Sequence, residues 1–183
     1  MVASNRSIRA LATVLAVLAL AFALGAPAAR AADMQYQDLP ANAKTYVEGI
    51  RGSCKELAGQ EAIPSDPMFG ISLVDLGDGT SALLLDNEHI CAEWYAGANC
   101  SNRGCDLVVM AKKGQSWKET FNEHLYQKFI SIGNDGKLKL ITATIYAGDP
   151  HCHPRRGANF TSGETCDVLI RYQNKGWHWE KIQ

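Results

Sequence analysis

The sequence has no excess of positive charge of the kind found in proteins that bind nucleic acid. Its 18 lysine and arginine residues are balanced by 19 aspartate and glutamate residues, which gives a formal net charge of −1. Binding to DNA or RNA needs a clustered basic surface. We therefore expect no nucleic-acid partner.

The chain also lacks the short motifs that mark common enzyme classes. It contains no Gly-x-Ser-x-Gly, no His-Glu-x-x-His and no phosphate-binding loop. A facing pair of carboxylates for glycoside hydrolysis cannot be recognised from sequence alone. These observations lean against an enzyme, and they indicate no cofactor.

The N-terminus reads as a secretory signal peptide over residues 1–31. Arg6 and Arg9 precede an apolar run from Ala10 to Ala26, and the small residues Ala29 and Ala31 follow. This order predicts cleavage after Ala31. The alternative is a membrane anchor, but the run is slightly short for a span and a cleavage motif follows it.

The mature chain, residues 32–183, is expected to form a single domain. It keeps 15 basic and 19 acidic residues, a net charge of −4, and contains no second apolar run of membrane length. We expect an exported protein, periplasmic or secreted, with no membrane span after cleavage. Its length is enough to bury a core.

Six cysteines remain in the mature part: Cys54, Cys91, Cys100, Cys105, Cys152 and Cys166. An even number of cysteines in an exported chain predicts disulfides rather than zinc ligands or reactive thiols.

Two segments resemble each other and suggest an internal duplication. "CDLVVMAKKGQSWKE" starts at Cys105, and "CDVLIRYQNKGWHWEK" starts at Cys166. Each lies 14 positions after another cysteine, Cys91 or Cys152, and a Gly-Ala-Asn sequence stands between the two cysteines in both cases. Each segment has the alternation and glycine turn of a β-hairpin.

The predicted fold is α+β and mainly antiparallel β. It has one N-terminal helix over about 41–58, with Asn42 as N-cap and Gly59 at its end, followed by two duplicated, disulfide-tied units of four meandering strands, about 69–121 and 124–182. Strands are expected near 69–75, 81–90, 105–112 and 115–121 in unit one, and near 124–132, 138–146, 166–173 and 176–182 in unit two. The sequence does not decide between one long sheet and two packed sheets.

The duplication favours one set of disulfides. Cysteines at equivalent positions would form Cys91–Cys105 and Cys152–Cys166, which leaves Cys54–Cys100 to join the helix to the strands. The rival scheme pairs Cys54 with Cys91 and Cys100 with Cys105.

The segments "VDLGDG" and "NCSNRGCDLVV" resemble a loosely defined family of small exported proteins, common in alphaproteobacteria, whose turns look like those of FG-GAP and VCBS repeats. The resemblance covers about 51–112 and implies no established activity. Acid-rich turns in such proteins can bind calcium, but here the turn offers only Asp75 and Asp78, fewer oxygens than calcium needs. We interpret it as a hairpin turn.

Two loops closed by cysteines carry the candidate binding residues. One contains Trp94 and Tyr95, and the other contains His153, Arg155 and Arg156. Tryptophan, tyrosine and arginine dominate binding hot spots, and loops on a rigid scaffold often carry recognition. The sequence thus favours a non-enzymatic or envelope-associated module that binds an unknown protein or glycan, although Trp94 and Tyr95 could simply cover the end of a sheet.

The alternative is a small metal-dependent or hydrolytic enzyme that uses His151 and His153. A histidine pair around a cysteine suggests a metal site, but a half-cystine at Cys152 could not be a ligand, and two histidines alone are an incomplete site. We therefore expect no metal, and we interpret these histidines as the polar rim of a closed loop.

Overall fold

The computed structural model describes residues 34–92, 100–101, 104–152 and 164–182, all within one compact unit, Ala31–Gln183. The predicted signal peptide, residues 1–31, lies outside the described residues.

Helix α2, Ala41–Ala58, is the one long helix of the described residues. Its buried side chains Ala43, Val47, Ile50 and Cys54 recur every three or four positions, so they form one face of the helix. Gly59 ends it with a φ of 85°, as expected. The expected N-cap is wrong: Pro40 takes that position, and the Nδ2 atom of Asn42 instead donates to the carbonyl oxygen of Trp117 at 3.0 Å. Short 3-10 helices flank α2 at Tyr36–Asp38 (η2) and Gln60–Ala62 (η3).

The first sheet contains a four-strand antiparallel meander plus one short strand. The strands are β1 (Ile71–Asp75), β2 (Ser81–Asp86), β4 (Gly104–Lys113) and β5 (Ser116–Leu125), with β3 (Cys100–Ser101) paired to the start of β4. The expected strand 81–90 is too long. The chain turns into helix α3 (Asn87–Ile90), because the Asp86 carboxylate accepts the N–H of Glu88 and caps this helix.

The second sheet is a four-strand antiparallel meander. Its strands are β6 (Gln127–Ile132), β7 (Leu138–Tyr146), β8 (Thr165–Gln173) and β9 (Gly176–Lys181), and the 3-10 helix η5 (Pro150–Cys152) follows β7. His124, expected in the first strand of unit two, belongs to β5 instead. The structure thus confirms an α+β, mainly antiparallel fold with two strand meanders, while their origin by duplication stays a prediction.

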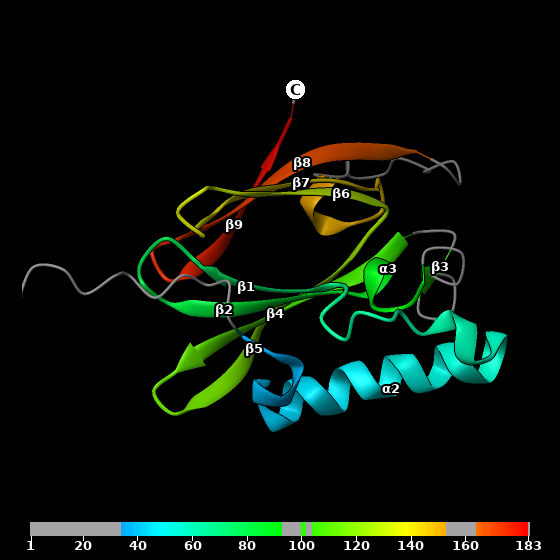
Figure 1. Cartoon of the computed structure of the whole chain (residues 1–183). Coiled ribbons are helices and arrows are strands. Elements are labelled where there is room, and N and C mark those ends of the chain that lie inside the picture. The colour runs from blue at the N-terminus through cyan, green and yellow to red at the C-terminus, as the bar shows by residue number, and fades with distance from the viewer. Residues whose placement is uncertain (1–33, 93–99, 102–103, 153–163, 183) are drawn as a thin grey trace, which may run out of the picture. The chain divides into compact units, whose positions relative to one another are not determined.

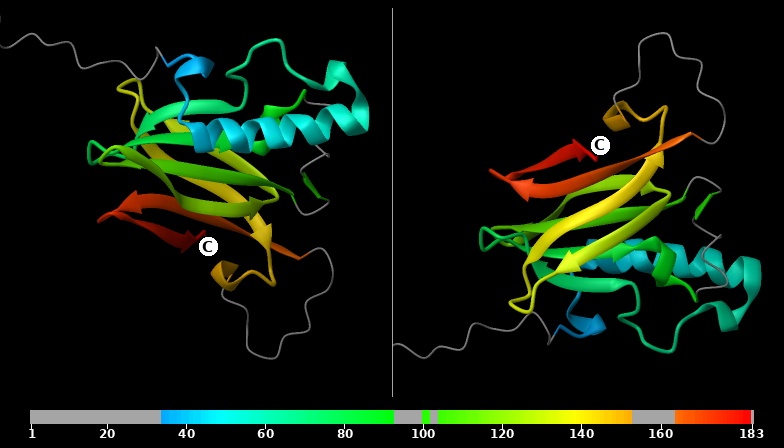
Figure 2. Two further views of the ribbon diagram at one scale, coloured as in Figure 1. Left: turned by 90° about the horizontal axis from the view of Figure 1, so that it is seen from below. Right: turned by 90° about the horizontal axis from the view of Figure 1, so that it is seen from above.

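The two sheets pack face to face, and α2 covers the opposite face of the first sheet (Figures 1 and 2). Strand β4 lies in the centre and is buried on both faces. Leu107, Val109 and Ala111 contribute to the core between the sheets, whereas Val108 and Met110 pack in the core under the helix. This alternation follows from the two-residue period of a strand. The question left open by the sequence is therefore answered: the units form two sheets, not one.

All six cysteines form disulfides, but only one of the favoured pairs is correct. Cys152–Cys166 is present as expected. Cys91 pairs with Cys54 rather than Cys105, and Cys100 pairs with Cys105 rather than Cys54, as in the rival scheme. The reason is the turn at α3, which directs Cys91 into the core under the helix, where Cys54 also lies. Equal spacing of cysteines therefore did not mean equal pairing.

Candidate functional site

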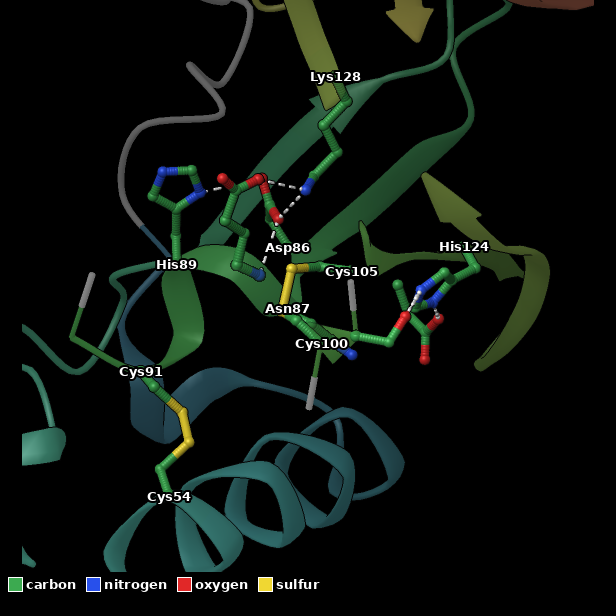
Figure 3. The surroundings of a disulfide bond; sticks show 12 residues. Cys54, Asp86, Asn87, His89, Cys91, Cys100, Cys105, His124 and Lys128 are labelled. Carbon is green, nitrogen blue, oxygen red and sulfur yellow. Dashed lines mark hydrogen bonds and ion pairs between the residues drawn. A yellow bond between two sulfur atoms is a disulfide. The ribbon is translucent and has the colours of Figure 1, made fainter. Parts of the chain in front are cut away.

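Two groups of polar side chains lie around the junction of β2, α3 and the start of β4 (Figure 3). The first, which we call the Lys128 cluster, consists of Lys128, Asp86, Glu88 and His89. The second, the Ser–His–Asp chain, consists of Ser101, His124 and Asp106.

Lys128 is the centre of the first group. It points inward from β6, and only 2% of its side chain is exposed. Its Nζ atom lies 2.9 Å from Oδ1 of Asp86 and 2.7 Å from Oε2 of Glu88. The other oxygen of Asp86 lies 3.1 Å from Nδ1 of His89. A buried ammonium is tolerated only when paired in this way.

The ammonium also sets the electrostatics of the cluster. Its hydrogen bond, with its charge, holds the pKa of Glu88 below the ordinary value against the opposing effect of partial burial. Asp86, Glu88 and His89 each offer one possible metal-ligand atom within 4.8 Å of the others. Lys128 supplies one positive charge that both carboxylates share, so the protein itself compensates part of their negative charge.

A cavity of about 200 Å³ adjoins this cluster. Its walls include Phe69, Asp86, His89 and Ile130, and the rings of Phe69 and His89 meet edge to face at 5.8 Å. The cavity is small for a ligand site, since pockets for small molecules usually occupy about 300–1,000 Å³. We attribute a structural role to the Lys128 cluster.

The second group has the connectivity of a nucleophile, a base and an orienting acid. Oγ of Ser101 lies 2.9 Å from Nε2 of His124, and Nδ1 of the same ring lies 2.6 Å from Oδ1 of Asp106. The side chains of His124 and Asp106 are 39% and 41% exposed, so solvent reaches the chain.

The pairing of β3, β4 and β5 in the first sheet positions these three residues. Cys100, Cys105 and Leu125 face one another across β3, β4 and β5. Ser101 follows Cys100, Asp106 follows Cys105, and His124 precedes Leu125. The Cys100–Cys105 disulfide joins β3 to β4 at this point. Regular strand pairing therefore holds His124 beside Ser101 and Asp106, from which it is 23 and 18 positions away in sequence.

Hydrogen-bond chemistry assigns the histidine tautomer. An ionised aspartate only accepts hydrogen bonds, so Asp106 requires a proton on Nδ1 of His124. In the neutral ring, Nε2 is then an acceptor, and the hydroxyl of Ser101 must donate to it. This is the arrangement in which a histidine can remove the serine proton.

A buried amide joins helix α2 to this region. Asn87 is 2% exposed, and its Nδ2 donates to the hydroxyl oxygen of Tyr46 at 2.9 Å, whose O–H in turn reaches Oδ1 of Asn87 at 3.1 Å. Burial, with a smaller contribution from the charge of Asp106, raises the pKa of Tyr46, although its bond to Asn87 opposes the shift. Tyr46 therefore stays neutral beside the Ser–His–Asp chain.

Most site residues expected from the sequence cannot be placed. Trp94, Tyr95, His153, Arg155 and Arg156 lie outside the described residues. The predicted binding role of the two loops therefore stays a prediction.

His151, the candidate from the alternative hypothesis, lies on η5 with its ring stacked on Trp179 at 3.9 Å. Partial burial raises the pKa of Glu123, and the charge of His151 opposes that shift. Within the described part of the chain, His151 belongs to no group of three possible metal ligands.

Asp75 and Asp78 stabilise a turn. Oδ1 of Asp75 accepts the N–H groups of Gly77 and Gly79 at 2.7 and 3.0 Å, and Oδ1 of Asp78 accepts the N–H of Thr80 at 2.9 Å. The interpretation as a hairpin turn between β1 and β2 agrees with these bonds.

The Ser–His–Asp chain could not be recognised in the sequence. Ser101 lies between two strands expected from the sequence and Asp106 lies within one of them, while the sequence places His124 at the start of the first strand of unit two. Only the pairing of β4 with β5 places His124 opposite Asp106. The one sequence feature that could have pointed to this chain is the Cys105-Asp106 pair at the start of β4.

The three disulfides indicate an oxidising, extracytoplasmic environment. In the part of the chain that the structure describes, no helix has the length and apolar character to cross a membrane. No protein-family profile, curated protein or solved structure matches the chain.

Proposed function

We propose that this protein is an exported binding module that recognises a partner protein through the second sheet. The observation that carries the proposal is that three exposed large apolar side chains lie on one strand or directly before it. Tyr126, Phe129 and Ile132 are 43%, 69% and 42% exposed, and they lie on β6 or directly before it. The only other exposed large hydrophobic residues described are Leu57 and Ile182.

The layer order supports this choice. Helix α2 covers the outer face of the first sheet, whereas no described helix covers the outer face of the second (Figure 2). Phe129 alternates along β6 with Lys128 and Ile130, which point to the core. An exposed phenylalanine therefore stands on an uncovered sheet face, and apolar patches of this kind mark interaction sites.

A protein partner fits this surface better than a glycan. Phe129 and Ile132 offer contact area but no hydrogen-bonding side-chain groups, and polar groups are what orient a sugar. The partner would dock on the face of the sheet rather than add a strand to β6, because an inward-pointing charge such as Lys128 opposes edge-to-edge pairing.

The two loops complete the proposal. Trp94 and Tyr95, with His153, Arg155 and Arg156, remain the proposed second contact region because of their residue types. The proposed membership in a family of small exported proteins adds no activity to this assignment.

A pull-down with matched variants tests the binding surface. Tagged wild-type protein and the Phe129→Ser variant would be incubated with envelope and culture extracts of the source organism, and retained proteins would be quantified by mass spectrometry. Leu57→Ser is the control, because Leu57 is 72% exposed but lies on α2. We expect a protein that wild type and Leu57→Ser retain equally and that Phe129→Ser loses at unchanged melting temperature. Equal retention by all three, or retention of glycan only, would contradict the proposal.

A further inference from the structure

We propose that Ser101 is an activated nucleophile and that the Ser–His–Asp chain hydrolyses carboxylic esters. This inference is independent of the proposed binding surface, since its residues lie on the first sheet. It differs from the expectation, based on the absence of common catalytic motifs, that the protein is not an enzyme.

The hydrogen bonds define the role of each residue. Nε2 of His124 accepts a hydrogen bond from Oγ of Ser101 at 2.9 Å, a distance at which a base can remove a proton. Asp106 holds the ring at 2.6 Å through Nδ1 and stabilises the imidazolium that forms when Nε2 takes the proton. A base oriented by a third group is the general sign of an activated nucleophile.

The proposed reaction consumes an ester and water and releases an acid and an alcohol. Oγ of Ser101 bonds to the ester carbonyl carbon while its proton passes to Nε2 of His124. The bond between that carbon and the alcohol oxygen then breaks, and His124 gives the proton to the departing oxygen. Water attacks the acyl group on Ser101, again transfers a proton through His124, and releases the carboxylic acid while Ser101 regains its hydrogen.

The hairpin that carries Ser101 is held from two sides. The Cys100–Cys105 disulfide closes it across β3 and β4. Gly104 has a φ of 119°, and a Cβ atom there would collide with the backbone of Leu125 and Tyr126. The end of β5 therefore packs directly against the hairpin, which keeps His124 in reach of Ser101. Positioning of this kind is what lets a hydroxyl react.

Esters with good leaving groups are the substrate class that this site would handle best. They need less stabilisation of the developing oxyanion than amides do, and the partly exposed histidine and aspartate leave the site open to an ester carried on a larger molecule. A general base of this kind typically contributes about 10²–10⁴-fold to the rate.

Covalent labelling combined with ester hydrolysis tests the proposal. The whole exported protein, with its disulfides intact, would be treated with a fluorophosphonate probe, the adduct would be located by peptide mass spectrometry, and hydrolysis of 4-nitrophenyl acetate would be followed in parallel. Ser101→Ala, His124→Gln and Asp106→Asn are the test variants. Ser116→Ala is the control, because Ser116 is also exposed on the first sheet but its hydroxyl donates to the carbonyl of Lys113.

We expect the probe on Ser101 of wild type and of Ser116→Ala, and none in Ser101→Ala. Labelling and hydrolysis should fall about 10²-fold or more in His124→Gln. The Ser101→Ala/His124→Gln double variant should lose no more hydrolytic activity than Ser101→Ala alone, because residues that act as a unit are not additive. Absence of a wild-type adduct, or labelling of Ser101 at the wild-type rate in His124→Gln, would overturn the proposal. Ser101 is an exposed residue, so Ser101→Ala, checked by its melting temperature, serves as the second test if His124→Gln proves unstable.

Discussion

The Nζ atom of Lys128 lies 2.9 Å from Oδ1 of Asp86, and this ion pair joins the second sheet to the first. Lys128 is almost fully buried, with 2% of its side chain exposed. Glu88 shares the same ammonium at 2.7 Å. One lysine therefore lies between two carboxylates and offsets part of their mutual repulsion.

Replacement of Lys128 by methionine should destabilise the protein strongly. The methionine would fill most of the volume, but Asp86 and Glu88 would lose their shared cation, and loss of one partner of a buried pair costs about 3 kcal/mol or more. Urea unfolding would measure the loss. Lys139→Met is the matched control, because Lys139 pairs with Asp135 at 3.2 Å while about half its side chain is exposed, and exposed pairs contribute about 1 kcal/mol or less. A similar small loss in both variants would contradict the structural role of the cluster.

Glu88 should make folding stability depend on pH in the acid range. The pKa of Glu88 is lowered in the folded protein, chiefly by its hydrogen bond to Lys128. A lowered pKa means that the unfolded state binds the proton more readily, so the stabilisation is present above the unfolded value of about 4.3 and is lost as pH falls through the folded value. Unfolding free energies at pH 7 and pH 3 would be compared for wild type and Glu88→Gln. We expect the advantage of wild type to shrink at pH 3, and an advantage that grows there would contradict this assignment.

The elements that the sequence predicted are those set by local rules. Helix α2 follows from its apolar face and from Gly59, and the strands follow from two-residue alternation between glycine turns. The burial of Lys128 could not be predicted, because it depends on how β6 packs over α3, and nothing near Lys128 in sequence marks it as an inward position. The Ser–His–Asp chain was hidden for the same reason, since strand pairing brings its members together.

The prediction of which cysteines pair failed for a different reason. Cys91 and Cys152 follow the second strand of each meander, so the equal spacing correctly located equivalent places in the two sheets. The helix lies against the first sheet alone, and Cys54 on its buried face meets Cys91 there. The spacing of the cysteines contains no information about which sheet the helix covers, so it could not predict this difference between the two sheets.

The three disulfides should differ in their contribution to stability in the order of the loops they close. Cys54–Cys91 spans 37 positions, Cys152–Cys166 spans 14 and Cys100–Cys105 spans 5. The chain-entropy relation gives about 4, 3 and 2 kcal/mol for loops of these lengths. Paired replacements by alanine, measured by urea unfolding, should follow this order. A larger loss from the Cys100–Cys105 pair than from the Cys54–Cys91 pair would contradict it.

Loss of the Cys100–Cys105 disulfide should lower the rate at which Ser101 reacts while the protein remains folded. The bond closes the shortest of the three disulfide loops, so its removal costs the least unfolding free energy of the three, yet it holds Cys100, the residue before Ser101, against Cys105, the residue before Asp106. Freed from this constraint, the hydroxyl would spend less time within reach of His124, and positioning errors of about 1 Å can cost about 10²-fold in rate. We therefore expect the Cys100→Ala/Cys105→Ala variant to remain folded by circular dichroism while its rate of fluorophosphonate labelling falls by about 10-fold or more.

The Cys152→Ala/Cys166→Ala variant is the matched control, since that disulfide lies on the second sheet and should leave the labelling rate unchanged. Equal loss of labelling in both variants would show that general destabilisation, rather than the position of Ser101, controls the reaction.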